Sequence, residues 1–304
     1  MSFSFIDYLA AKKSVDDRAL NRLVLRHLVD NLPAAPAEKP LRVLEVAAGI
    51  GAMFERLVEW QILGNADYTA LDLSPACVAA AKERLPAWAG QHGFQPEWAA
   101  DGSLSLRRAG QQIRVQFEVA DVVDFAARPH VAPPWDLLIA HAFFDLVDIA
   151  ALLPGLLALL KPGGLFYFSI NFDAETILIP EIEPALDRQI IDLYHRAMAR
   201  QHVNNVALSG PAAGRYLFQH LRAANSQLIT AGSSDWVVFP GPAGYPASEA
   251  FFLHCIIDSI GNMLGDSAPV DVAPWLARRH AQIEQNELVY IAHNLDFVGR
   301  TSAG

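Results

Sequence analysis

Cysteine is scarce in this chain, where only Cys77 and Cys255 occur among 304 residues. Two cysteines cannot build a disulfide framework or a cysteine-based zinc site, and such low usage suits a reducing compartment. Long basic runs are also missing, and the formal net charge is -10. Because contacts to phosphates need clustered Lys and Arg, nucleic acid is not expected as a partner.

Hydrophobic stretches long enough to cross a membrane are missing as well. The longest apolar region, 146–160, is interrupted by Asp148 and Pro154, whereas a membrane helix needs about 20 predominantly apolar residues. The N-terminus carries Asp7 and has no long apolar core after a basic start, which argues against a signal peptide. We therefore expect a cytoplasmic protein without a membrane partner.

Apolar residues are nevertheless abundant, since 52% of the chain is hydrophobic and only 18% is charged. A chain of this length forms one large domain or two small ones, with a sizeable core in either case. The apolar surplus suits either a buried interface between copies of the chain or an apolar substrate site. A homo-oligomer and a small-molecule partner are both compatible with this composition.

The stretch that organises the chain is 43–51, Val-Leu-Glu-Val-Ala-Ala-Gly-Ile-Gly, which is followed by apolar residues at helical spacing over 52–60. This order predicts a strand, a tight turn and a helix. Glycine lets the backbone approach a ligand at a helix N-terminus, where unpaired N–H groups collect. A nicotinamide-binding turn would require a third glycine where Phe54 stands, which argues against that version.

A second strand is predicted over 67–73, with Asp72 near its end. Ser74 and Pro75 then have the residue types of a helix N-cap and a first helical position. A carboxylate at the carboxyl end of this strand is placed to accept both ribose hydroxyls of a nucleoside ligand. Further on, alternating residues over 103–119 predict an extra hairpin before or within the third strand of the sheet.

The fourth and fifth strands are predicted over 134–141 and 165–171. Open α/β sheets bind ligands at the carboxyl ends of their strands. His141, which ends the fourth strand, is therefore a candidate general base with Asp145 as its candidate partner. Ahead of the sheet, one helix is expected over 2–13 and a second from Ser14, because Ser14 and Asp17 have cap spacing.

Five features follow one another along the chain: the glycine loop, Asp72, Asp121, the segment at His141 and the Leu-Lys-Pro-Gly-Gly sequence at 160–164. In this order they resemble the motifs of the class I S-adenosylmethionine-dependent methyltransferases. The pattern of that family is acid-x-Gly-x-Gly-x-Gly. Here it begins at Glu45, and Ala47 replaces the first glycine. The extra methyl group narrows the turn without obviously blocking it.

The resemblance implies a doubly wound, mostly parallel, seven-stranded α/β sheet whose antiparallel last strand, 287–298, lies between the fifth and sixth. It implies S-adenosyl-L-methionine as cofactor and in-line methyl transfer to a small organic acceptor. Because the leaving thioether is neutral, the reaction needs orientation more than acid catalysis. The residues implied to bind the cofactor are Glu45, Ala47, Gly49, Gly51, Asp72, Leu73, Asp121, Val122 and His141.

The resemblance also implies a helical lid over 1–40, where Tyr8, Lys12 and Arg18 are the residues suspected of facing the cofactor. A methyltransferase domain would follow over 41–304, with 173–212 and 241–286 as cap or substrate insertions. A nicotinamide-dependent oxidoreductase and a non-catalytic nucleoside-binding protein are the alternatives. No metal is expected, because no His-x-x-x-His or Glu-x-x-His pair lies near the glycine loop.

Overall fold

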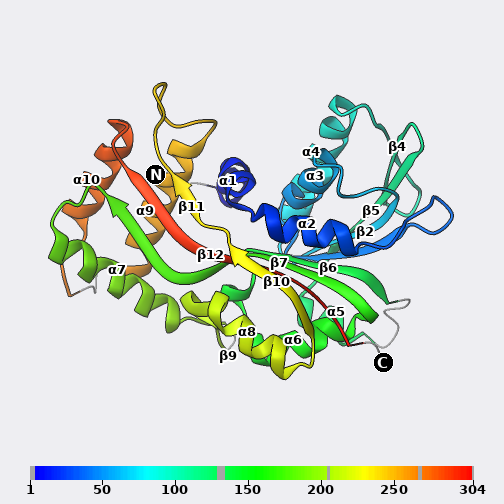
Figure 1. The fold of residues 1–304 in the computed structure, drawn as a ribbon. Helices are drawn as coiled ribbons and strands as arrows, with labels where there is room; N and C mark the ends of the chain where they lie inside the picture. Colours follow the sequence, from blue (N-terminus) through cyan, green and yellow to red (C-terminus); the bar gives the residue numbers. More distant parts are fainter. Residues whose placement is uncertain (1–3, 129–133, 204–205, 266–268, 303–304) are drawn as a thin grey trace.

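The computed structural model describes residues 4–128, 134–203, 206–265 and 269–302. Its central feature is a ten-stranded mixed sheet with helices on both faces (Figure 1). In spatial order the strands are β10 (Gln227–Ser233), β12 (Val289–Arg300), β7 (Leu160–Ile179), β6 (Trp135–His141), β1 (Leu41–Val46), β2 (Ala66–Asp72), β5 (Gln111–Val119), β4 (Leu104–Arg108) and β3 (Gln95–Trp98). The tenth strand, β11 (Trp236–Val238), pairs with β12, and β8 (His202–Val203) pairs with β9 (Val206–Ala207) in a separate sheet.

The helices form two layers and an additional lobe (Figure 1). One layer contains α2 (Arg22–Asn31), α3 (Ala52–Glu59) and α4 (Pro75–Gln91); the other contains α5 (Val122–Ala126), α6 (Ile149–Ala158) and α8 (Ala213–Ala223). The lobe contains α7 (Pro184–Ala199), α9 (Glu249–Leu264) and α10 (Ala273–Glu284), with α1 (Phe5–Ala19) packed against α9. Two short 3₁₀ turns are η1 (Phe144–Leu146) and η2 (Gly210–Ala212). Within the described residues, no helix combines the length and apolar character needed to cross a membrane.

The predicted strand order is confirmed. The strands β7, β6, β1, β2 and β5 are neighbours in parallel, and β12 lies antiparallel between β7 and β10. The predicted number of seven strands is wrong. The strands β3 and β4 extend the sheet past β5, because the outer edge of β5 is free to pair. The sixth strand, expected over 227–239, divides into β10 and β11.

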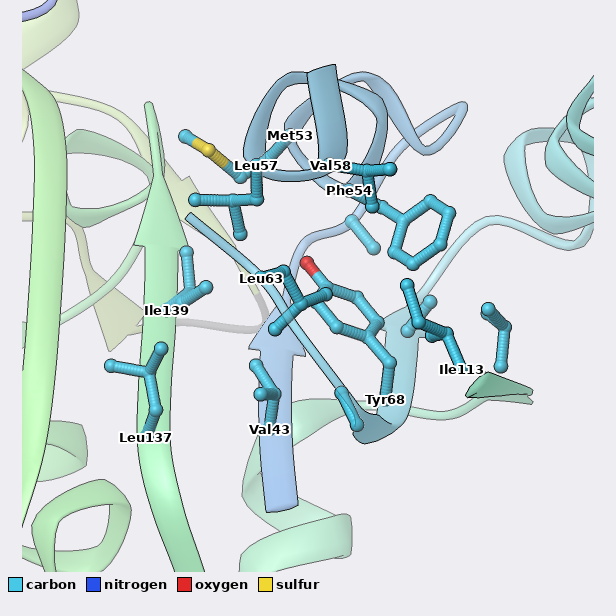
Figure 2. Packing of buried hydrophobic residues seen from close by; sticks show 14 of the residues in the cluster. Val43, Met53, Phe54, Leu57, Val58, Leu63, Tyr68, Ile113, Leu137 and Ile139 are labelled. Atoms are coloured by element: carbon cyan, nitrogen blue, oxygen red, sulfur yellow. The ribbon is translucent and has the colours of Figure 1, made fainter. Parts of the chain in front are cut away.

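Strand β1 is buried on both faces, as expected for a parallel strand inside an α/β fold. Val43 packs toward α3, together with Phe54, Leu57 and Tyr68, and Figure 2 shows these side chains between the helix and the sheet. The neighbouring Leu44 belongs to the opposite core, under α6 and α8. The carboxyl end of β1 is thereby held between two packed layers, which positions the glycine loop that follows.

Strand β7 is longer than predicted, and together with β12 it carries the lobe. The expected strand over 165–171 instead runs from Leu160 to Ile179, and its far end pairs with the beginning of β12. Two register shifts interrupt this pairing, and such bulges bend a strand pair. The bent ends support a third core that includes Leu178, Ile190, Val238, Phe252 and Trp275. The sequence pattern missed this extension because backbone pairing with a distant strand stabilises it.

The prediction for the two N-terminal helices is correct in number and wrong at their boundary. Ser14 does not begin the second helix as predicted, because α1, which is capped by Ser4, continues through Ser14 to Ala19. Ser14 sits inside the helix, where its hydroxyl donates to the carbonyl of Ala11. The second helix is capped by Asn21, whose side chain accepts from the N–H groups of Leu23 and Val24. The continuous α1 reaches across the carboxyl ends of β1 and β6.

Candidate functional site

The glycine loop between β1 and α3 turns through left-handed backbone conformations. Ala47, Gly49 and Gly51 have φ of 54°, 55° and 83°. A Cβ atom on Gly51 would lie 3.1 Å from Leu85 of α4, so the loop is also packed tightly from below. Ala47 adopts the same conformation with a methyl group, which costs about 1–2 kcal/mol relative to a right-handed residue. From above, Leu9 of α1 lies 3.3 Å from the position of a Cβ on Gly49.

Asp72, at the carboxyl end of β2, joins this loop to the next one. Its Oδ2 accepts from the N–H of Gly49 at 2.7 Å, and its Oδ1 accepts from the N–H of Ser74 at 2.8 Å. The side chain is half-buried, and each carboxylate oxygen can accept more than one hydrogen bond. Asp72 is therefore fixed in orientation and keeps acceptor capacity for a ligand. The predicted Ser74 cap of α4 is confirmed, because Ser74 Oγ accepts from the N–H of Cys77 at 3.3 Å.

The adjacent edge, where β5 ends, presents apolar side chains next to a carboxylate. Asp121 caps α5, with its Oδ1 accepting from the N–H of Val123 at 2.7 Å. Val122 is half-buried, whereas Leu73 and Val123 are 68% and 58% exposed. The ends of β2 and β5 are hydrogen-bonded, from the N–H of Ala120 to the carbonyl of Asp72. An apolar ring system with polar edges fits such a surface.

Glu45 is turned into the core beneath the loop. Its carboxyl is 1% exposed and accepts from the Tyr68 hydroxyl at 2.7 Å. Burial raises the pKa of Glu45 to about 8, although the hydrogen bond from Tyr68 opposes this rise. The charged form is disfavoured because water is excluded and the hydrogen-bond donor is neutral.

A second polar group, called here the Asp16 cluster, consists of Lys12, Asp16, His141, Ser169 and Trp236. Asp16 Oδ2 accepts from Lys12 Nζ at 2.6 Å and lies 2.9 Å from His141 Nε2, while Trp236 Nε1 donates to Asp16 Oδ1 at 2.9 Å. The cluster joins α1 to the end of β6, to the middle of β7 and to β11. It therefore fixes α1 across the carboxyl edge of the sheet.

His141 bonds within this cluster through both ring nitrogens, since Nδ1 lies 2.8 Å from Ser169 Oγ. Burial and the charge of Lys12 lower the pKa of His141 to about 4, although the neighbouring Asp16 opposes this shift. Asp145 is not a hydrogen-bonding partner of His141 among the described residues; Asp16 is. Asp16 was missed from sequence, and the only local signal for it is its spacing of four residues from Lys12.

The three residues suspected of facing a ligand from the N-terminal helices lie at different places. Tyr8 stacks on Phe252 of α9, with ring centroids 5.8 Å apart, and remains half-buried. Lys12 belongs to the Asp16 cluster. Arg18 forms an ion pair with the buried Glu249 at the start of α9, so it holds α1 to the lobe. Within the described residues, no group of three or more His, Cys, Asp or Glu side chains is arranged to hold a metal ion.

Comparison with known proteins places this geometry in context. Residues 44–166 match the family model described as a methyltransferase domain. Those residues contain the glycine loop, Asp72, Asp121, His141 and the first strands of the sheet. A search among curated proteins finds no match to the sequence.

Several solved structures resemble this chain at low identity. A candidate methyltransferase from Bacillus halodurans has 14% identity and a TM-score of 0.49, over 91% of this chain and 98% of that one. An S-adenosylmethionine-dependent methyltransferase from Methanosarcina mazei has 9% identity and a TM-score of 0.47, over 94% and 99% of the two chains. A candidate methyltransferase from Haloferax volcanii, solved with the Trm112 activator, has 17% identity and a TM-score of 0.45, over 99% and 100%. These likenesses are too distant to indicate an acceptor.

Proposed function

Because residues 44–166 match a methyltransferase-domain model, we propose that this chain is a class I S-adenosylmethionine-dependent methyltransferase and binds S-adenosyl-L-methionine across the carboxyl ends of β1, β2 and β5. The methyl group is transferred from there to a small organic acceptor by in-line displacement. The acceptor would approach from the ends of β6 and β7, under α1. In this proposal residues 1–40 act as a lid, and 173–212 and 241–286 shape the acceptor side.

The observation that carries the proposal is the link between the glycine loop and Asp72. The carboxylate is oriented by the N–H groups of Gly49 and Ser74, is half-buried and retains acceptor capacity. Two neighbouring ribose hydroxyls are complementary to such a carboxylate, because each can donate one hydrogen bond to it. The exposed Leu73 lies next to Asp72, where it would contact the base of the nucleoside.

The other proposed cofactor residues complete this arrangement. Asp121 and Val122 would contact the adenine ring from the end of β5, and Ala47, Gly49 and Gly51 would line the loop. Contact between Glu45 and the amino-acid end of the cofactor stays a prediction. Its carboxyl is buried against Tyr68, so direct contact would require the loop above it to move.

When bound, S-adenosylmethionine supplies a methyl group on a positively charged sulfur, and its leaving group is a neutral thioether. The protein then has to orient the acceptor and exclude water. The fixed α1 suits water exclusion, because the Asp16 cluster and the Arg18–Glu249 pair hold it over the sheet. Both ring nitrogens of His141 are bonded within the Asp16 cluster, and its pKa is lowered to about 4, which makes it a weak proton acceptor. We therefore assign His141 to positioning within that cluster.

Titration of Asp72→Asn with S-adenosylhomocysteine tests the proposal. We expect the free energy of binding to weaken by roughly 1.5–3 kcal/mol, because a charged acceptor is lost while the shape is kept. Isothermal titration calorimetry measures the change. The matched control is Asp67→Asn, which removes the same charge from the exposed opposite end of β2 and should leave affinity unchanged.

An unchanged dissociation constant in a folded Asp72→Asn protein would refute the ribose assignment. Binding of NAD with no binding of S-adenosylhomocysteine would favour the oxidoreductase alternative. Cofactor binding without labelled methyl transfer to any metabolite would favour the non-catalytic alternative.

A further inference from the structure

Two histidines meet head-on where α9 and α10 pack together. The Nδ1 atoms of His254 and His280 lie 2.7 Å apart, and the planes of the two rings differ by only 16°. The ring centroids are 5.0 Å apart, which is as far as a contact of 2.7 Å between two ring atoms allows. The two Nδ1 atoms therefore lie on the line that joins the rings, and each points at the other. This is the geometry of a hydrogen bond in which one hydrogen lies between two nitrogens.

Asp258 fixes which ring nitrogens carry hydrogen. Its Oδ1 lies 2.9 Å from Nε2 of His280, and an ionised carboxylate only accepts hydrogen bonds, so this Nε2 holds a hydrogen. In a neutral His280 the Nδ1 is then a bare acceptor, and the hydrogen between the rings comes from Nδ1 of His254. One extra proton on the pair leaves the bond intact, because Nε2 of His254 can take it. A second extra proton puts hydrogen on both Nδ1 atoms, and the bond is lost.

The spacing of the two nitrogens fits a proton and not a metal ion. Two nitrogens bound to one tetrahedral zinc ion at about 2.0–2.1 Å would lie about 3.3 Å apart, with both lone pairs directed at the ion. Here the lone-pair directions of His254 and His280 are directed at each other, and Asp258 lies on the far nitrogen of His280. This agrees with the absence of a three-ligand group from the described part of the chain.

Helix α10 is attached on two sides. Toward α9, Gly261 lies about two helical turns after His254, and a Cβ atom there would be 2.6 Å from Leu276 Cδ1 of α10, so the two helices touch at this point. Toward α7, the fully buried Arg279 donates to Asp187 Oδ1 at 2.7 Å. Loss of the bond between the histidines would therefore loosen α10 from α9 while the ion pair with α7 remains.

The charged groups that act on His254 come from both helices. Burial lowers the pKa of His254 and the charge of His280 lowers it further, whereas Glu284 of α10 and Asp258 of α9 oppose the shift. From α1, Asp7 acts on the neighbouring thiol of α9. Because the folded-state pKa lies below the ordinary value of 6.5, stability that depends on a neutral His254 is complete above about pH 6.5 and is lost progressively as the pH falls below it.

We propose that His254 and His280 form a proton-controlled clasp between α9 and α10, closed while one hydrogen is shared between the rings and open when both rings are fully protonated. Two like charges at this distance repel each other, and neither Nδ1 can then accept a hydrogen bond. The helix that the clasp steadies is the one that holds α1, since Glu249 of α9 pairs with Arg18. Acid would thus loosen the lobe from within, whatever reaction the protein performs.

Hydrogen exchange of the full chain, followed by mass spectrometry, tests the clasp. The exchange rate of the α10 amides in the natural protein is divided by their rate in His254→Asn at the same pH, so that the intrinsic effect of pH cancels. Asparagine keeps an N–H donor near the position of Nδ1 and cannot take up a proton. We expect this ratio to be constant above about pH 7 and to rise by up to about tenfold for each pH unit below about 6.5.

A matched variant and a second measurement keep the test decisive. His27→Asn makes the same change on a half-buried histidine of α2 and should leave the exchange of α10 unchanged at each pH. Nitrogen-15 NMR of the natural protein, with signals assigned from His254→Asn and His280→Asn, should show hydrogen on Nδ1 of His254 and on Nε2 of His280 above about pH 7. Bare Nδ1 atoms on both rings, a ratio that does not depend on pH, or the same pH response in His27→Asn would each overturn the proposal.

Discussion

Two buried acids, Glu45 and Asp16, have pKa values that are shifted in opposite directions. Glu45, under the glycine loop, has a neutral donor in Tyr68, and burial raises its pKa to about 8. Burial alone would also raise the pKa of Asp16, but Lys12 and His141 beside it lower that pKa well below its ordinary value. The partners of a buried carboxyl, and not its depth, decide whether it carries a charge.

The glycine loop region and the Asp16 cluster also differ in whether their polar groups can still bind a ligand. In the glycine loop region, the polar groups of Asp72 contact only backbone N–H groups and keep capacity for a ligand. In the Asp16 cluster, side chains from α1, β6, β7 and β11 satisfy one another. The first region is therefore suited to binding, and the second is suited to holding a helix in place.

The largest effect is expected from breaking the Asp16 cluster. Asp16→Asn removes the charge that faces Lys12 and leaves a buried ammonium group without its counterion. Breaking a buried ion pair from one side typically costs 3–5 kcal/mol, so we expect a loss of roughly that size in the free energy of unfolding. Urea denaturation monitored by circular dichroism measures it. Because the pKa of Asp16 is lowered, the stability it contributes is present above about pH 4 and lost as the pH falls below that value.

Two variants check that this loss comes from the uncompensated charge. Asp30→Asn makes the same change on an exposed part of α2 and should alter stability by less than about 0.5 kcal/mol. The double variant Lys12→Met with Asp16→Leu removes both charges and should recover part of the loss. If Asp16→Asn is as stable as the natural protein, the ion pair does not hold α1.

Glu45→Gln tests the second of the two buried acids, the one whose hydrogen-bond donor is neutral. The folded-state pKa of Glu45 is raised from 4.5 to about 8, so its contribution to stability is present below pH 4.5 and lost as the pH rises toward 8. Glutamine keeps an acceptor for Tyr68 and cannot ionise. Relative to the natural protein, we expect the free energy of unfolding of the variant to rise by up to about 1.4 kcal/mol for each pH unit in that window.

Thermal unfolding at several pH values measures this gain. At pH 4, where both side chains are neutral, the two proteins should unfold at similar temperatures. A difference that does not depend on pH would mean that Glu45 is already charged in the folded state.

The smallest effect is expected at the glycine loop. Ala47→Gly restores the first glycine of the family pattern at a residue with φ of 54°. Relief of left-handed strain favours the variant, whereas the greater freedom of glycine in the unfolded chain opposes it by about 0.4–1 kcal/mol. We expect a net change within about 1 kcal/mol, measured by urea denaturation. A change of more than tenfold in affinity for S-adenosylhomocysteine would instead show that the methyl group of Ala47 limits access to the loop.

Local patterns in the sequence were sufficient to predict several of the strands, turns and helix caps. The strand, glycine turn and helix over 43–60, the cap at Ser74 and the hairpin around Gly110 all follow from residue types at short spacing, and the structure contains each of them. Such features depend on neighbours in the chain, through backbone conformation, capping and alternation. The order of the parallel strands followed from the family resemblance.

The Asp16 cluster and the bend in β7 and β12 were decided only by the tertiary structure. His141 and Asp16 are 125 positions apart in the chain and meet because α1 crosses the end of β6. Strand β7 continues past 171 because the beginning of β12 offers its backbone for pairing. Contacts between distant segments leave no periodic signal in either one, and a side chain's charge depends on which partners the fold brings to it.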